Sequence, residues 1–227
     1  MTGMLILLAD SQLLFPGRKS AALLRLLKAR LSGKRGIYIG AANGNEPVFH
    51  ELAREAFSAF GASLEMQPGA SVSLDTRADF YVLAGGDVEL GWKYFSQPEI
   101  LQSLNDARAQ NAVFIGVSAG AMHLSGAVMP LCETTKLGEE NVHALPELQR
   151  YLNWVNLAVA VHEESQNWPT LENWRRNLCH QTALALIPLG GALVVTGNGV
   201  WQTGNPVQWH SANGEYRVPA LPESDFE

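Results

Sequence analysis

The sequence predicts an α/β protein in which a mostly parallel sheet lies between helix layers, a three-layer sandwich. Three observations predict this fold. Short apolar runs alternate along the chain with stretches whose apolar residues recur at helical spacing. The apolar runs are continuous, as expected for strands buried on both faces. Charged residues make up only 17 % of the 227 residues, against roughly 25 % in typical domains, which fits a broad core.

Each expected element follows from its residues. Leucines at helical spacing with basic residues on the other face predict a helix over residues 20–31. Two further helices are expected over residues 51–60, where Gly61 ends the helix, and over residues 98–110. The turn signal Asn198-Gly199 predicts a hairpin. Strands are expected over residues 5–9, 36–42, 80–84, 112–117, 157–161, 191–196 and 200–203.

Length, charge and cysteine content exclude several classes of protein. The chain is long enough for one large domain, expected over residues 1–227, and too short for two comfortable ones. A net charge of -6 argues against a nucleic-acid binder, and Cys132 and Cys179 alone make neither a disulfide framework nor a metal cluster. The first apolar run ends at Asp10 and has no basic segment before it, so it is interpreted as a strand and not a signal peptide. With no apolar run of 18 residues, we expect a cytoplasmic protein without a membrane span.

The sharpest motif is G-x-S-x-G at residues 116–120, directly after an expected strand and before an expected helix. A nucleophilic serine must project from a very tight strand-to-helix turn, where the glycines remove side chains that would clash. The helix N-terminus then supplies backbone N–H groups near a developing oxyanion. The motif therefore predicts Ser118 as a nucleophile, and a glycine-rich turn without chemistry is the alternative.

Two further features could complete such a site. The sequence Gly85-Gly86-Asp87 follows another strand, and glycines there let the backbone approach a ligand closely, although a plain turn explains them equally well. Among six histidines, His162 stands out as the base because it follows the apolar run 157–161, at a strand end where site residues gather. The other five have weaker context: His50, His123, His143, His180 and His210.

In combination, these motifs resemble those of a known peptidase family. A strand followed by GGD, a helix, FIGVSAGA and a later strand ending in His is similar to the serine peptidase family of dipeptidase E (aspartyl dipeptidase) and cyanophycinase. The resemblance extends over residues 5–200 and implies the class I glutamine amidotransferase-like fold. Amidotransferases of that fold carry a cysteine at the nucleophile position of the strand-to-helix turn. The serine at that position in this chain, Ser118, therefore indicates the peptidase branch.

The resemblance implies roles for individual residues. Ser118 and His162 match the catalytic serine and histidine, and Gly86 and Ala119 match the oxyanion-hole amides. The acid of dipeptidase E lies fifteen positions after the serine, which in this chain is Glu133. The implied activity is a serine exopeptidase or dipeptidase acting through an acyl-enzyme, without metal or cofactor.

The family's preference for an N-terminal aspartate implies a cation in the substrate pocket. Arg175 or Arg176 could bind the carboxylate beside Asp87, and surface arginines complementing a helix end are the alternative. Trp168 and Trp174 could wall a pocket, but packing is the stronger expectation for tryptophan. The expected partner is therefore a small peptide, and a homodimer is left open.

Two positions depart from the family pattern. His162 precedes Glu163, where the family often has an aromatic residue, and Leu189 occupies the position of a glutamate in cyanophycinase. Glu163 or Glu164 could replace the acid, although neighbours of a histidine rarely orient it from the correct side. Two alternatives therefore stay open. One is a catalytically silent or divergent binding protein of this fold, and the other is a serine esterase using His210 and Glu172.

Overall fold

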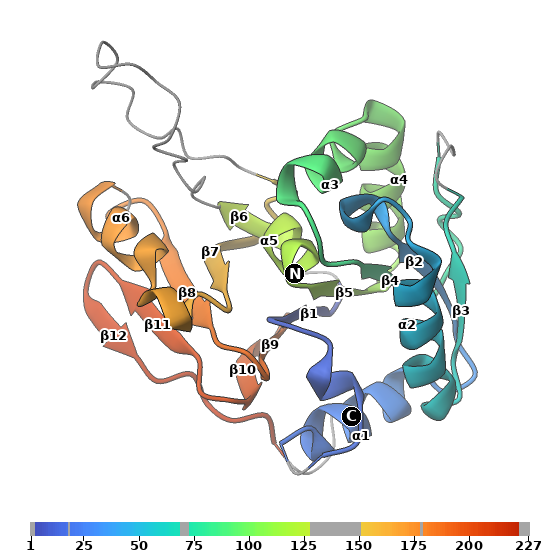
Figure 1. Ribbon diagram of the computed structural model, residues 1–227, viewed down its shortest axis with the longest axis horizontal. Helices are drawn as coiled ribbons and strands as arrows, with labels where there is room; N and C mark the ends of the chain where they lie inside the picture. The colour runs from blue at the N-terminus through green and yellow to red at the C-terminus, as the bar shows by residue number, and fades with distance from the viewer. Residues whose placement is uncertain (1–2, 18, 69–72, 128–150, 178, 223–227) are drawn as a thin grey trace.

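The computed structural model describes residues 3–17, 19–68, 73–127, 151–177 and 179–222. Its largest element is a seven-stranded sheet in the order β10-β9-β1-β5-β4-β2-β3 (Figure 1). The five strands from β1 to β3 in that order are parallel, whereas β9 runs antiparallel to β1 and to β10. The strands are β1 (Leu5–Leu8), β2 (Arg35–Ile39), β3 (Ser63–Met66), β4 (Phe80–Leu83), β5 (Val113–Val117), β9 (Gly191–Thr196) and β10 (Gly199–Gly204).

Helices cover both faces of this sheet, because alternate residues of the buried strands point to opposite sides. On one face, Ile6 and Leu8 share a core with helices α1 (Ala21–Leu31) and α2 (Pro47–Ala59). On the other face, Leu5 and Leu7 share a core with helices α3 (Val88–Phe95), α4 (Pro98–Ala109) and α5 (Ala119–Leu124). The predicted parallel sheet between helix layers is therefore confirmed.

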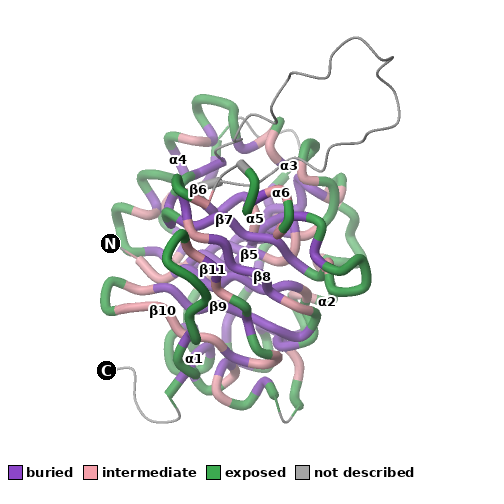
Figure 2. Tube along the Cα trace, turned by 90° about the vertical axis from the view of Figure 1, so that its left-hand side faces the viewer, coloured by how far each residue is buried: buried purple, intermediate pink, exposed green. Residues whose placement is uncertain are grey.

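A second, five-stranded sheet, in the order β12-β11-β8-β7-β6, packs against the core of the first. On its other face, Trp168 and Trp174 are buried beside helix α6 (Pro169–Asn177). Both tryptophans therefore serve packing, as expected, and line no part of the cavity described below. Figure 2 shows the central strands of both sheets buried, among them β5, β7 and β8, whereas α1 and α6 expose their outer sides. The strands are β6 (Ser125–Ala127), β7 (Val155–Val161), β8 (Ala183–Ile187), β11 (Gln208–Ser211) and β12 (Gly214–Tyr216).

Most expected elements are present within a few residues of their predicted bounds. The hairpin at Asn198-Gly199 is confirmed, with Gly199 paired to Thr196 across β10 and β9. Helix α2 begins earlier than expected, at Pro47, because proline is well suited to the first helical turn. Three 3-10 turns complete the described elements: η1 (Gln12–Leu14), η2 (Ala41–Asn43) and η3 (Glu164–Gln166). Within the described ranges, no helix has the length and apolar character needed to cross a membrane.

Candidate active site

Ser118 lies at a strained junction between β5 and α5. Its backbone has φ 52° and ψ -113°, a conformation that non-glycine residues rarely adopt. Its N–H donates to the Leu8 carbonyl at 2.8 Å, which ties the turn to the end of β1. Strain of this kind is typical of a serine held on a tight strand-to-helix turn with its hydroxyl exposed.

The two glycines of the motif make this turn sterically feasible. A Cβ on Gly116 would lie 2.4 Å from the Gly120 carbonyl oxygen, and one on Gly120 would lie 2.0 Å from the Leu83 carbonyl oxygen. Both distances are far below van der Waals contact. The glycines are therefore required by the close approach of α5 to β4 and β5.

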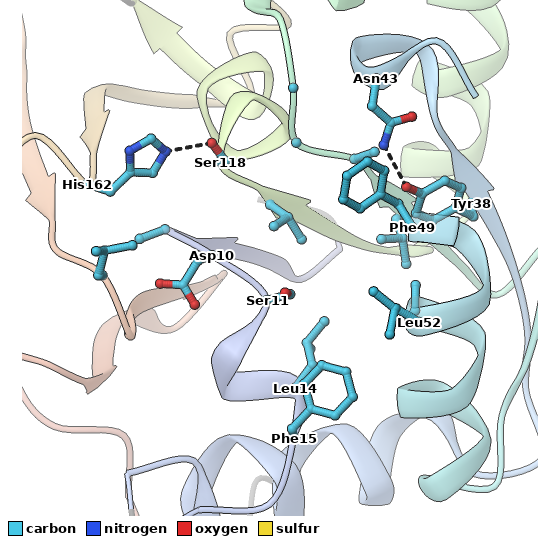
Figure 3. Close-up of a pocket in the computed structure, with 18 residues that line it drawn as sticks. Asp10, Ser11, Leu14, Phe15, Tyr38, Asn43, Phe49, Leu52, Ser118 and His162 are labelled. Carbon is cyan, nitrogen blue, oxygen red and sulfur yellow. Dashed lines mark hydrogen bonds between the residues drawn. The ribbon is translucent and has the colours of Figure 1, made fainter. Parts of the chain in front are cut away.

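His162 comes from the other sheet and reaches the serine. It directly follows β7, and its N–H donates to the Ile187 carbonyl at 2.9 Å, so the backbone position is fixed by pairing with β8. Its side chain is exposed at the mouth of the site, and a hydrogen bond of 2.8 Å joins Nε2 to Ser118 Oγ (Figure 3). The topology thus brings together two residues that lie 44 positions apart.

Ala119 and the Gly85-Gly86 turn are the neighbours of the serine. Ala119 is the first residue of α5, so its N–H has no acceptor within the helix. The Gly85-Gly86 turn packs against Ser118, since a Cβ on Gly85 would lie 3.1 Å from the serine Cβ. Gly86 has φ 139°, and a Cβ there would lie 2.2 Å from the Ala42 carbonyl oxygen, so only glycine fits.

Neither neighbouring glutamate is hydrogen-bonded to His162 in the described structure. Glu133 lies outside the described residues. The Glu163 carboxylate accepts from the N–H of Thr170 at 3.2 Å and from its hydroxyl at 2.6 Å, at the start of α6. The Glu164 carboxylate accepts from the Leu189 N–H at 2.9 Å. Each neighbouring glutamate thus has a structural partner elsewhere.

The residues expected to bind substrate lie away from the cavity wall. Asp87 caps helix α3, where its Oδ1 accepts from the Leu90 N–H at 2.7 Å. Arg175 and Arg176 are exposed on α6, and they form ion pairs with Glu215 at 3.8 Å and with Glu172 at 2.9 Å. The expectation that these arginines bind a substrate carboxylate is therefore not supported. In the structure they form ion pairs on the protein surface instead.

None of the other described histidines is hydrogen-bonded to Ser118. His210 is buried in β11 with its Nδ1 3.4 Å from Glu215, and burial lowers its pKa. The Ser118 hydroxyl is hydrogen-bonded to His162, so the serine esterase triad with His210 and Glu172 is not formed. Of the remaining histidines, His50 contacts the Leu64 carbonyl, His180 is exposed beyond α6, and His143 lies outside the described residues.

A cavity of about 430 Å³ opens from Ser118 and His162 (Figure 3). Its wall is built by the segment after β1, by η2, by the first half of α2 and by the ends of β4 and β5. It lies at the carboxyl edge of the parallel strands, where ligands of open α/β sheets bind. Among the described residues, no group of three His, Cys, Asp or Glu side chains is arranged to hold a metal ion.

The chain is similar in fold to solved peptidases. The crystal structure of a peptidase from an acI-B1 Actinobacterium matches it with a TM-score of 0.73 and 19 % sequence identity, over 98 % of this chain and 96 % of that one. A protein described as a candidate peptidase E from Listeria monocytogenes EGD-e matches with a TM-score of 0.61 and 18 % identity, over 90 % of this chain and all of that one. No family model and no curated protein matches the sequence. At these identities, the comparisons establish the fold.

Sequence reasoning missed the residues that shape the cavity. Asp10 ends an apolar run in the sequence, and it lies in the cavity wall, as do Phe49 and Leu52 of α2. A signal for Asp10 was present, because a polar residue directly after a strand lies at the sheet edge where sites form. No pattern could reveal the role of the α2 residues, since their contact with the site depends on tertiary packing.

His123 lies buried behind the nucleophile, as expected for a packing role. Its side chain is fully buried, its Nε2 donates to the Val88 carbonyl at 2.8 Å, and it packs against Phe95 and Tyr151. Burial lowers its pKa to about 4, because a charged imidazole there would lose its hydration, although the Asp87 charge acts in the opposite direction. The ring is therefore neutral at pH 7 in the folded protein.

This burial predicts a loss of stability in mild acid. The unfolded chain binds a proton at His123 below its ordinary pKa of 6.5, whereas the folded chain does so only near 4. The stability that depends on a neutral His123 is therefore fully present above pH 6.5, and it is lost as the pH drops toward 4. Between pH 7 and pH 5, we expect the unfolding free energy to fall by about 2 kcal/mol more in the wild type than in His123→Gln.

Urea denaturation of both proteins at the two pH values measures this difference. His180→Gln, at an exposed position, is the matched control and should retain the wild-type pH dependence. Equal pH dependence in wild type and His123→Gln would contradict the assignment.

Proposed function

We propose that the protein is a serine-type peptidase that hydrolyses small peptides through an acyl-enzyme formed on Ser118. The observation that carries this proposal is the 2.8 Å hydrogen bond between Ser118 Oγ and His162 Nε2 at a strained strand-to-helix turn. A serine within hydrogen-bond reach of a histidine base is the arrangement that activates a hydroxyl for nucleophilic attack. The similarity in fold to proteins named as peptidases supports the same reaction class.

In the first half of the reaction, the Ser118 oxygen attacks the peptide carbonyl carbon while His162 Nε2 takes the hydroxyl proton. The carbonyl oxygen becomes an oxyanion, for which the amides of Gly86 and Ala119 are the proposed donors. His162 then gives the proton to the leaving amine as the C–N bond breaks. The products of this half are the free amine and an ester on Ser118.

In the second half, water replaces the amine. His162 takes a proton from the attacking water, the oxyanion forms again, and the ester bond to Ser118 breaks as the serine oxygen recovers a proton. The carboxylic acid is released and the enzyme is regenerated. The loss of one oxyanion-hole donor typically lowers the rate by about 10²–10³-fold.

Glu133 is the proposed third member, because it stands at the position of the family acid. An acid orients the histidine ring and stabilises its charged form, so we expect Glu133→Gln to lower kcat by about 10⁴-fold. Glu163→Gln and Glu164→Gln are the comparison variants, since both carboxylates bind elsewhere in the structure. Steady-state kinetics of the three variants tests this role, and a near-normal rate for Glu133→Gln would remove it from the site.

The preference for an N-terminal aspartate does not form part of the proposed function. It required a cation at the substrate side chain, and Arg175 and Arg176 form ion pairs on the outer face of α6 instead. Without a side-chain preference, the proposed substrate class is a small peptide with a free N-terminus.

Hydrolysis of a set of dipeptides, followed by amino-acid release, tests the reaction class against its alternatives. The proposal predicts release of free amino acids at a rate that is lost in Ser118→Ala. Hydrolysis of p-nitrophenyl esters with no release from any peptide would identify an esterase. Absence of both reactions, with no modification of Ser118 by a fluorophosphonate, would identify a silent binding protein and overturn the proposal.

A further inference from the structure

The cavity beside Ser118 is lined mostly by apolar side chains. Leu14 and Phe15 come from the segment after β1, and Phe49 and Leu52 come from the first turns of α2 (Figure 3). Phe49 is 51 % exposed and Leu52 is 49 % exposed, although both are large apolar residues. A concave apolar wall that is left open to water is typical of a ligand pocket, because a bound apolar group removes its surface from water.

The described part of the cavity wall offers no arginine or lysine to receive an acidic side chain. A carboxylate that entered this wall would lose hydration without gaining a counter-charge, which is strongly unfavourable. The lining therefore selects against the aspartate side chain that the family resemblance implies.

One negative charge lies at the edge of this apolar wall, on Asp10. Its Oδ1 accepts from the Gln12 N–H at 2.7 Å and its Oδ2 accepts from the Gly190 N–H at 2.5 Å, so the carboxylate is held in place. Each oxygen retains a further acceptor site. No described Arg, Lys or His forms an ion pair with it.

Strand register places Asp10 at the same edge of the sheet as the nucleophile. Leu8 pairs with Val117 across β1 and β5, and Ser118 donates its N–H to the Leu8 carbonyl. Asp10 therefore follows β1 at the same sheet edge at which Ser118 follows β5. In a substrate attacked by Ser118, the α-ammonium of the N-terminal residue is two bonds from the carbonyl carbon, and its side chain leaves the same Cα.

We propose that this peptidase is selective for peptides whose N-terminal residue is apolar, with the side chain in the cavity of Phe49 and Leu52 and the α-ammonium on Asp10. This inference rests on the proposed function, since it names the substrate class of that site. Asp10 acts as a binding residue that selects a free N-terminus, and the α2 residues determine the preferred side chain.

Kinetics on matched dipeptides tests this selectivity. We expect kcat/KM for Phe-Leu and Leu-Leu to exceed that for Asp-Leu by about 100-fold or more, from apolar contacts alone. Phe49→Ala and Leu52→Ala should each lower kcat/KM for Phe-Leu by about 10-fold while changing Ala-Leu little, because alanine does not reach the wall. Val48→Ala is the matched control, since Val48 is an exposed apolar residue on α2 outside the cavity and should behave as wild type.

Acetylation of the substrate tests the role of Asp10 without any change to the protein. N-acetyl-Phe-Leu should be hydrolysed at least about 10-fold less efficiently than Phe-Leu by the wild type, and Asp10→Asn should bring the two rates close together. Equal rates for the two peptides in the wild type would overturn the assignment of Asp10, whether or not the variant folds.

The outcomes separate this inference from the proposed function. A preference for Asp-Leu, or no preference, with Ser118 still modified by a fluorophosphonate, would overturn the apolar selectivity and leave the serine peptidase intact. No hydrolysis of any peptide and no modification of Ser118 would overturn both.

Discussion

Ser118→Ala is expected to lower kcat/KM for peptide hydrolysis by about 10⁴–10⁶-fold, because the variant has no oxygen with which to form the acyl-enzyme. The residual rate would come from substrate binding and the oxyanion amides alone. Ser118 carries no other described hydrogen bond through its side chain than that to His162, so folding should be unaffected. Steady-state kinetics together with circular dichroism measures both quantities.

His162→Gln is expected to produce a loss of similar size, since the hydroxyl is a poor nucleophile without its base. The two residues act as one unit, so the double variant should be no slower than either single variant. Ser63→Ala, on the exposed edge strand β3, is the matched control and should retain full activity. A less than tenfold loss in either Ser118→Ala or His162→Gln would contradict the proposed roles.

Gly120→Ala is expected to be strongly destabilising. The new Cβ would lie 2.0 Å from the Leu83 carbonyl oxygen, which belongs to the buried strand β4 and cannot move without displacing the sheet. Overpacking of this kind usually costs about 1–3 kcal/mol, and the contact with backbone places the expected loss at about 3 kcal/mol or more. Because α5 must shift, the Ser118 turn should also move, and activity should fall with stability.

Gly17→Ala is the control for the glycine substitution itself. A Cβ at Gly17 meets only the Ser20 hydroxyl, at 3.6 Å, and the backbone there has no positive φ. Its unfolding free energy should stay within about 1 kcal/mol of wild type. Urea denaturation of both variants measures the difference, and equal stabilities would show that α5 does not approach β4 as closely as described.

The sheet and the tight turn at Ser118 could be predicted from the sequence because both rest on local signals, whereas the role of Ser118 as a nucleophile stays a prediction. Continuous apolar runs identify buried strands, and the steric demand of the Ser118 turn fixes glycine at two flanking positions. The prediction of His162 depended on a strand end, and the structure joins it to Ser118. Its catalytic role, like those of Gly86 and Ala119, stays a prediction.

The second sheet was only partly predicted for a physical reason. Strand β8 is short, and its apolar run lies beside a proline and the polar end of α6, where periodicity is weak. The edge strand β12 and its neighbour β11 carry polar residues, so no apolar run marks them. Helix α3 has only eight residues, too few for a clear helical period.

The character of the cavity could not be predicted from the sequence. Phe49 and Leu52 look like ordinary helix residues, and only the position of α2 over the sheet edge brings them beside Ser118. The family resemblance implies a cation for an N-terminal aspartate, and Arg175 and Arg176 are the arginines that could supply it, yet their helix packs on the outer face of the second sheet. The position of that helix relative to the cavity depends on tertiary packing, so the sequence alone could not exclude this role.

Modification by a fluorophosphonate, followed by intact mass measurement and peptide mapping, tests the central claim most directly. We expect one adduct per chain, on Ser118, and a modification rate that falls at least about 100-fold in His162→Gln because the base is lost. An adduct on another residue, or equal rates in the wild type and His162→Gln, would contradict the claim.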